Sequence, residues 1–359
     1  MEAKKERLIF IDLMRAFAVL QMVQGHTINS LLSPEYRTVE SGFYYIWHTI
    51  RGFTAPIFMF TSGLAFTYLL RSVNIPFNQN PRVVKGLKRV GLLLFLGYIL
   101  RFPLSQVFDL SGISYAQWLT FYTVDALHII GIGLFFVIGL SYISEKFKIS
   151  DNITYTIAAL FFFLLAPSVL TSNAFDTLPP IIRGFFTDRY GSLFPLFPWA
   201  GYVMAGAILG SFIANNKEFV KTRVFSYNLV FYGSLFVSLS AIISQLSIHG
   251  LIEDKYWVEI IKLVLLRTGV VIALYGFATI VEKKMSHCPK IVRMLGGNTL
   301  FIYVAHLMVL YGFVFFPGFD SIAGSQLNST AALSSAVAMI LLMIGMVKAN
   351  SKLKYVFKR

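Results

Sequence analysis

Residues that could do chemistry are concentrated near the N-terminus, in the apolar segments LIFIDLMRAFAVLQMVQGHTINSLL and FYYIWHTIRGFTAPIFMFTSGLAFTYLL. Arg15 and His26 are eleven residues apart, which at about 100° per residue places both on one face of a helix. His48 and Arg51 are three residues apart and share a face of the second helix. Charged and imidazole groups at membrane depth are costly unless they face a protein interior or a water-filled cavity. These four residues therefore predict a functional site.

Further ionisable residues occur in later apolar segments. Asp125 and His128, three apart in FYTVDALHII, could form a pair in which the carboxylate fixes the imidazole tautomer and raises its basicity, or a purely structural pair. Arg267 is predicted near mid-membrane, where it needs an internal partner such as Asp125 or another carboxylate. His306 lies inside RMLGGNTLFIYVAHLMVLYG and is either a site residue or a hydrogen-bonded structural histidine.

Other polar residues could hold an anionic ligand on the cytoplasmic side. Asn298 is a natural N-cap, and the start of its helix offers amide N–H groups to an anion, although most such residues only cap. In the predicted loop 71–89, Lys85, Lys88 and Arg89 either anchor the chain to lipid head groups or hold the phosphates of a donor such as coenzyme A.

Composition places the chain among multi-pass membrane proteins. It has 359 residues, of which 56% are hydrophobic and 13% charged, a profile that soluble domains do not show. Apolar runs long enough to cross about 30 Å recur roughly ten times. We predict one all-α domain over residues 1–359, with spans near 8–31, 43–70, 90–107, 119–143, 153–170, 195–213, 226–246, 258–281, 295–316 and 331–347. The prolines and small residues of FPLFPWAGYVMAGAILG predict a closely packed helix.

The distribution of charge predicts the orientation. Most Lys and Arg residues fall in the N-terminal segment, the even-numbered loops and the C-terminal tail, so both termini are expected in the cytoplasm. Each Trp lies where an even-numbered helix would begin at the outer interface: Trp47, Trp118, Trp199 and Trp257. The basic residues behind the net charge of +14 are therefore explained by the orientation in the membrane, and they predict no nucleic-acid partner. The sequence has no metal-ligand motif and no nucleotide-binding loop, so no metal is predicted.

Several motifs resemble a known superfamily. DLMRAFAVLQMVQGH, in which ten residues separate the Arg from the His, is similar to the first-helix signature of the transmembrane acyltransferases. These include the acyltransferase type 3 proteins and the heparan-alpha-glucosaminide N-acetyltransferase catalytic domain. WHTIRGFTAPIFMFTSG resembles the second-helix block of the latter, and LFPLFPWAGYVMAGAILG and LGGNTLFIYVAHL also resemble family blocks. The resemblance extends from Ile11 to about Tyr311.

The resemblance implies an enzyme that transfers an acyl group, most often acetyl, from cytoplasmic acyl-coenzyme A to a sugar hydroxyl or amine at the outer face. Arg15 and His26 match the first-helix motif, and His48 matches the catalytic His of the N-acetyltransferase branch. Arg51 stands where a neutral residue is usual. We expect His48 to be the principal base or a transient acyl carrier, assisted by His26, with Arg51 or a second His stabilising the oxyanion.

The full prediction names two sets of residues. The catalytic set is His48, His26, Arg51, Asp125 and His128, and the set that binds acetyl-coenzyme A is Arg15, Asn298, Lys85, Arg89 and His306. The expected partners are a carbohydrate or glycoconjugate acceptor and membrane lipids, the expected location is a bacterial inner membrane, and a homodimer is left open. The alternative is a secondary transporter or lipid-linked sugar translocator, which the lack of an inverted sequence repeat disfavours.

Overall fold

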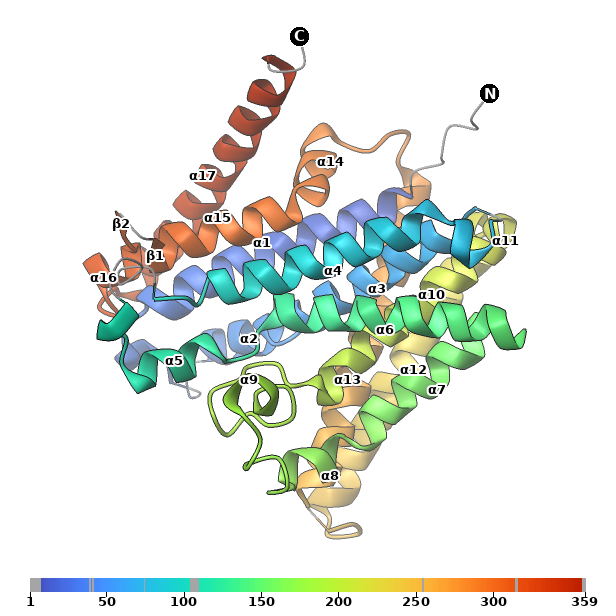
Figure 1. The fold of residues 1–359 in the computed structure, drawn as a ribbon, viewed down its shortest axis with the longest axis horizontal. Helices are drawn as coiled ribbons and strands as arrows, with labels where there is room; N and C mark the ends of the chain where they lie inside the picture. Colours follow the sequence, from blue (N-terminus) through green and yellow to red (C-terminus); the bar gives the residue numbers. More distant parts are fainter. Residues whose placement is uncertain are drawn as a thin grey trace. The chain divides into compact units, whose positions relative to one another are not determined.

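The computed structural model is almost entirely helical and describes residues 8–38, 40, 42–73, 75–103, 110–253, 255–313 and 316–356 (Figure 1). Within this part of the chain, 7 helices are long and apolar enough to cross a membrane, or 8 if the bent pair α14 (Lys290–Gly297) and α15 (Thr299–Tyr311) forms one span. The predicted all-α membrane protein is therefore confirmed. Helices α1 (Ile9–Leu31) and α4 (Pro81–Ile99) have sufficient length, but their polar residues lower the mean hydropathy below that of the others.

The helices gather into two compact units. Unit 1 comprises the described residues of Met1–Thr54, Leu104–Ser111 and Val281–Arg359. Unit 2 comprises Ala55–Pro103 and Gly112–Ile280, and is therefore inserted in the sequence between parts of unit 1. The single domain over residues 1–359 stays a prediction.

Unit 1 is built around α1. Its other elements are a 3₁₀ turn η1 (Pro34–Tyr36), α2 (Gly42–Arg51), α14, α15, the two-stranded antiparallel hairpin of β1 (Gly312–Phe313) and β2 (Phe316–Pro317), α16 (Phe319–Ala323) and α17 (Ser329–Val356). Helices α14, α15 and α17 pack against α1, which runs beside α15 in Figure 1. The contact with α14 is close, because a Cβ atom added to Gly296 would lie 2.7 Å from the Asp12 carbonyl oxygen.

The end of α1 is bonded to the chain just before α17. The Leu327 N–H donates to the Leu31 carbonyl and the Ser33 N–H donates to the Leu327 carbonyl, both at 2.9 Å. Beside these bonds, a small buried cluster joins α1 to α17 through Ile28, Leu32, Ala332 and Ala336. Segments from the two ends of the sequence therefore complete one core.

Unit 2 contains most of the long apolar helices. All its elements, in chain order, are α3 (Thr54–Arg71), η2 (Phe77–Gln79), α4, α5 (Tyr115–Phe121), α6 (Ala126–Phe147), α7 (Asp151–Leu164), α8 (Ala166–Thr171), α9 (Pro180–Arg183), α10 (Leu196–Asn215), α11 (Lys217–Lys221), α12 (Arg223–Ile248) and α13 (Tyr256–Lys284). The 3₁₀ turn η4 (Leu110–Gly112) is divided between the two units. Helix α10 packs against α6 and α7, and α4 packs against α6.

Glycines bring α3 and α10 into backbone contact. A Cβ atom added to Gly63 would lie 1.9 Å from the Val203 carbonyl oxygen, and one added to Gly206 would lie 1.9 Å from that of Phe60. Helices approach this closely in membranes through small residues, since lipid supplies no hydrophobic force between them. The predicted packing role of the α10 segment is confirmed.

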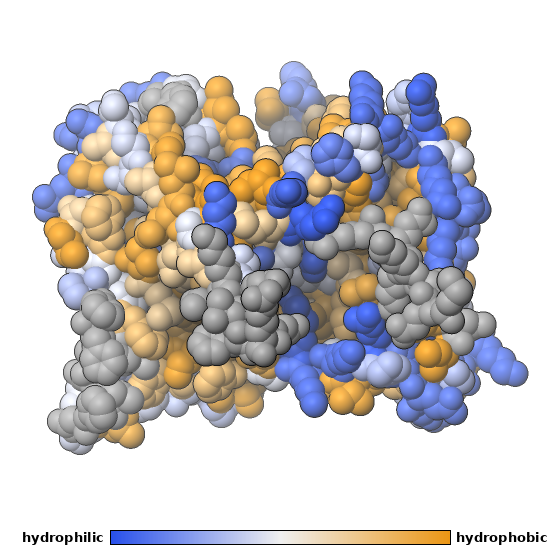
Figure 2. Space-filling view, turned by 90° about the horizontal axis from the view of Figure 1, so that it is seen from above, coloured by the Kyte–Doolittle hydropathy of each residue, from blue (hydrophilic) through white to orange (hydrophobic). Residues whose placement is uncertain are grey.

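Large apolar side chains cover much of the surface. Phe95 on α4, Phe231 on α12 and Leu341 on α17 are each 62% exposed, and Figure 2 shows broad apolar areas on the face in view. Contiguous apolar surface of this kind is unfavourable in water and favourable in hydrocarbon. The exposed side chains therefore fit a chain that lies in a bilayer.

Two predicted boundaries are wrong. Helix α4 begins at Pro81 rather than 90, because the Asn80 side chain accepts the Arg82 N–H at 2.9 Å and proline suits the first helical position. Residues 81–89, predicted as loop, are therefore helical. The predicted span 119–143 is interrupted, since α5 ends at Phe121 and α6 begins only after Asp125. Residues 104–107 of the predicted span 90–107 lie outside the described chain.

Candidate functional site

His306 is a fully buried imidazole on α15. Its Nδ1 lies 2.8 Å from the carbonyl oxygen of Ile302, one turn earlier. Because a carbonyl can only accept a hydrogen bond, Nδ1 carries the proton in the neutral ring and Nε2 carries the lone pair. Nε2 has no hydrogen-bond partner among the described residues. This nitrogen therefore has a lone pair that none of the described residues uses.

His26 on α1 lies beside His306. Their ring centroids are 5.4 Å apart, and His26 Nδ1 lies 3.4 Å from the hydroxyl of Tyr311, which ends α15. His306 is buried, His26 is half-buried and Tyr311 is exposed, so the group extends from the interior of unit 1 to its surface. We call His26, His306 and Tyr311 the histidine site. Two imidazoles and a phenol can accept, donate and pass on a proton.

Helix α2 docks on α1 next to the histidine site. The Trp47 indole N–H donates to Gln24 Oε1 at 2.7 Å, and the Arg51 guanidinium donates to the Asn29 side chain. The side chain of Arg51 also packs on Gly25, where an added Cβ atom would lie 3.1 Å from Cγ. Arg51 thus contacts the turn of α1 that carries His26.

His48 is exposed on α2. Its ring lies 5.8 Å from that of Tyr44, one turn earlier on the same helix. The sequence predicts that His26 and His48 work together, and this stays a prediction. The proximity of His26 to His306 is a feature that the sequence did not predict.

The residues proposed to bind the donor belong to both units. Arg15 is half-buried on α1, and Lys85 and Arg89 are exposed on α4 in unit 2. Asn298 occupies the N-cap position at the 72° bend between α14 and α15. Its side chain, however, donates to the Met294 carbonyl at 2.8 Å and makes no capping bond to α15. The predicted N-cap position is therefore confirmed, but the side chain does not cap α15, because α14 directly precedes Asn298 and offers its free terminal carbonyls.

Unit 2 contains a second buried polar cluster, at the start of α6. Asp125 Oδ1 accepts the Leu127 N–H at 3.0 Å, and Asp125 Oδ2 lies 3.4 Å from Arg101 Nε. His128 is fully buried, with its ring 4.3 Å from that of Tyr98. This cluster joins the end of α4 to the start of α6.

The contact between Asp125 and His128 differs from the predicted one. His128 Nδ1 lies 3.5 Å from Asp125 Oδ1 but accepts the backbone N–H of Asp125 at 3.2 Å. An acceptor nitrogen carries no proton, so the backbone rather than the carboxylate fixes the neutral tautomer. The two side chains form a capping box, as a Ser and Glu pair would.

Replacing Asp125 with Asn is expected to lower the free energy of unfolding by about 3 kcal/mol, because it removes the partner of the largely buried Arg101. Asn caps a helix as well as Asp does, so the change isolates the lost charge. The midpoint of unfolding in detergent measures the effect. The exposed Asp188 provides the control, and Asp188→Asn should change stability by less than about 0.5 kcal/mol. Equal midpoints for the two variants would contradict a stabilising role of the ion pair.

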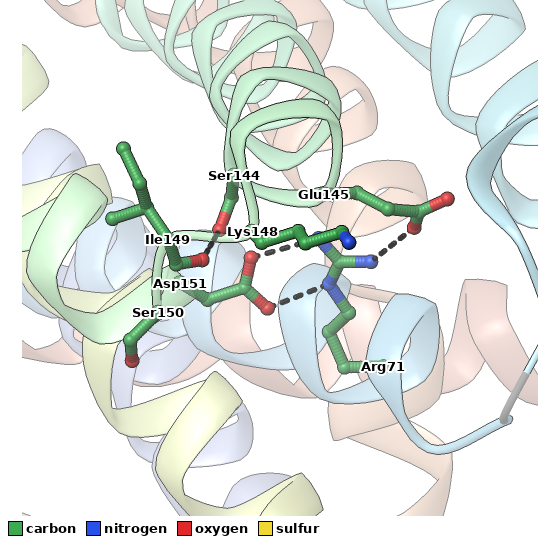
Figure 3. Close-up of a pocket in the computed structure, with 7 residues that line it drawn as sticks. All are labelled: Arg71, Ser144, Glu145, Lys148, Ile149, Ser150 and Asp151. Atoms are coloured by element: carbon green, nitrogen blue, oxygen red, sulfur yellow. Dashed lines mark hydrogen bonds and ion pairs between the residues drawn. The ribbon is translucent and has the colours of Figure 1, made fainter.

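An ion cluster fastens the end of α3 to the turn between α6 and α7. Arg71 Nε lies 2.7 Å from Asp151 Oδ2, Arg71 Nη1 lies 3.3 Å from Glu145 Oε2, and Nη2 donates to the Ser141 carbonyl at 2.9 Å. Figure 3 shows the contacts of Arg71 with Asp151 and Glu145, with Lys148 beside them. These residues line a pocket of about 370 Å³. Since both carboxylates already neutralise Arg71, we interpret the cluster as structural.

The fold and the histidine site define an integral multi-pass membrane protein with imidazoles among its helices. A comparison with protein-family models identifies the family more closely. The model of the catalytic region of heparan-alpha-glucosaminide N-acetyltransferase matches residues 7–244. The chain belongs to this family and is therefore a membrane acetyltransferase. A search of curated proteins gave no match.

The matched residues include His26 but not His306 or Tyr311. The sequence predicts His306 as a donor-binding residue and carries no signal for Tyr311. No spacing signal could have found the pairing, because His26 and Tyr311 are 285 positions apart.

Proposed function

We propose that the chain transfers an acetyl group from cytoplasmic acetyl-coenzyme A to a hydroxyl or amine of a sugar or glycoconjugate at the outer face of a bacterial inner membrane. The proposal rests on the family and on one observation: a buried neutral imidazole, His306, lies beside a second imidazole, His26. The acetyl donor, the acceptor and the use of histidine are parts of this proposal.

The proposed reaction needs a base. The acceptor oxygen or nitrogen forms a bond to the acetyl carbonyl carbon while its proton moves to His306 Nε2. The C–S bond then breaks, and the coenzyme A thiolate leaves and takes up the proton. A neutral imidazole serves this purpose at physiological pH, because its conjugate acid returns the proton readily.

His26 has a supporting role in this scheme. Its ring, next to His306 and Tyr311, could pass the proton on or donate a hydrogen bond to the oxyanion that forms during attack. Arg51 of α2, which contacts Asn29 and Gly25 of α1, could add positive charge near that oxyanion. His48 remains the alternative base or acyl carrier that the family resemblance implies.

A second candidate function is favoured by the 72° bend between α14 and α15. Secondary transporters bind their substrates where membrane helices are broken, so a secondary transporter or lipid-linked sugar translocator is the alternative. It would move a sugar across the bilayer without consuming coenzyme A.

Proteoliposomes supplied with acetyl-labelled coenzyme A and a panel of sugars and amino sugars distinguish the two functions. We expect label in a sugar product together with an equal amount of free coenzyme A thiol, and both should depend on the acceptor. Sugar uptake without thiol release would support the transporter instead. Empty liposomes control for spontaneous acetyl transfer to amines.

A further inference from the structure

Arg267 lies within the membrane-spanning helix α13, eleven residues after its start at Tyr256. Arg267 is therefore about 16 Å from the start of α13, measured along the helix axis. None of the ion pairs formed within the described part of the chain includes Arg267. The predicted pairing with Asp125 is absent, because the cation beside that carboxylate is Arg101.

Aromatic residues of α10 surround Arg267 instead. Its Cζ lies 4.9 Å from the centre of the Trp199 ring, and the hydroxyl of Tyr202 lies beside its guanidinium. Trp199 and Tyr202 are on neighbouring turns of α10, with ring centroids 5.8 Å apart. Tyr202 is fully buried, and its hydroxyl makes no hydrogen bond of normal geometry within the described chain.

These contacts leave the charge of Arg267 uncompensated. A guanidinium has five N–H donors and keeps its charge at any physiological pH. The Trp199 ring attracts the cation but carries no net negative charge and accepts no strong hydrogen bond. An arginine inside a membrane ordinarily faces an anionic partner or water. A ligand could supply the anionic partner that these side chains do not provide for Arg267.

We propose that Arg267, Tyr202 and Trp199 bind the phosphate group of a membrane-embedded phosphorylated molecule. Guanidinium binds two phosphate oxygens through parallel N–H bonds, and the neighbouring hydroxyl can donate to a third. Helical side chains point toward the helix N-terminus, so the guanidinium extends toward the end of α13 that begins at Tyr256. Trp199, whose ring contacts Arg267, lies in the first turn of α10. A position near the start of a membrane-spanning helix suits a phosphate at the boundary of the hydrocarbon.

The proposal is independent of acetyl transfer, and its residue Arg267 lies beyond the region matched by the family. Two sources can supply the phosphate: the head group of a membrane lipid, or a phosphate group carried by a soluble molecule. Trp199 and Arg267 are both partly exposed, so a ligand can reach them from outside unit 2.

The test measures binding to the delipidated full-length protein by native mass spectrometry. The probe is dioleoyl phosphatidic acid, and dioleoylglycerol, with the same acyl chains and no phosphate, is the comparison. We expect phosphatidic acid to bind at least about tenfold more tightly, and Arg267→Gln to remove that difference. Tyr202→Phe, which keeps the ring and removes one donor, should weaken phosphatidic acid by about threefold or more. If inorganic phosphate competes with phosphatidic acid, the phosphate group alone is sufficient for binding. If it does not compete, the ligand is a phosphorylated lipid.

The control is a second cation over an aromatic ring. Arg183 Cζ lies 3.5 Å from the Tyr190 ring centre in the segment around α9, and Arg183→Gln should bind phosphatidic acid as the unmodified protein does. Equal binding of the two lipids, or unchanged affinity in both Arg267→Gln and Tyr202→Phe, would overturn the proposal. If Arg267→Gln does not fold, Arg267→Lys and Tyr202→Phe decide the question, since each retains most of the packing.

Discussion

Replacing His306 with Asn is expected to lower the rate of acetyl transfer by about a hundredfold or more, the usual contribution of a general base. The Asn amide N–H₂ can take the place of Nδ1 and keep the bond to the Ile302 carbonyl, so the buried helix contact survives. The lone pair at Nε2 is lost, and no other atom at this position can accept the acceptor's proton. Steady-state kinetics on reconstituted protein, with thiol release as the readout, measure kcat.

Two other histidines make this prediction specific. His249→Asn changes an exposed residue at the end of α12 and should leave kcat unchanged. His48→Asn tests the alternative base. A loss confined to His48→Asn, with His306→Asn near full activity, would transfer the base role to α2 and contradict the scheme centred on His306. His26→Asn is expected to cause a smaller loss, because His26 assists the base and does not replace it.

Replacing Gly206 with Ala is expected to have the largest effect on stability, lowering the free energy of unfolding by about 3 kcal/mol or more. The added Cβ atom would lie 1.9 Å from the Phe60 carbonyl oxygen, inside van der Waals contact. That oxygen belongs to the backbone of α3 and cannot rotate aside, so the two helices must separate. Separation would break the paired contact of Gly63 with Val203. Thermal and SDS-induced unfolding in detergent measure the loss.

Glycines without neighbours provide the control for Gly206. An added Cβ atom at Gly91 on α4 or Gly139 on α6 meets nothing within 4 Å. Ala at these positions should keep or raise stability, by up to about 1 kcal/mol, because Ala favours helix more than Gly does. If Gly206→Ala unfolds at the same midpoint as Gly91→Ala, the close contact between α3 and α10 does not exist in the membrane.

The long apolar helices were predictable because lipid imposes length and hydropathy on the sequence. The predicted spans 195–213, 226–246 and 258–281 correspond to α10, α12 and α13 within a few residues. Helix boundaries set by local side-chain bonds were harder. The Asn80 and Pro81 pair is a standard helix-start signal, but the basic residues that follow it favour a cytoplasmic loop under the positive-inside rule.

The site was predictable only as a set of residue types. Ionisable residues in apolar segments marked His26, Arg51, Asp125 and His128, because such groups are costly in lipid. Their partners were not predictable, since pairing depends on how helices distant in sequence pack. Arg267 shows the limit clearly: a carboxylate was expected, and an aromatic ring and a phenol occupy that place.

The joining of α1 to the chain before α17 has a consequence for biosynthesis. The Leu31 and Leu327 backbone bond and the contacts of α1 with α14 and α15 all require residues after 280. At about 5–20 residues per second, the ribosome needs roughly 10–50 s to make the intervening chain. During that interval Asp12 has no α14 neighbour and His26 has no α15 neighbour. The nascent N-terminal helix must therefore wait, with its polar face shielded by water or by the insertion machinery, until the last helices emerge.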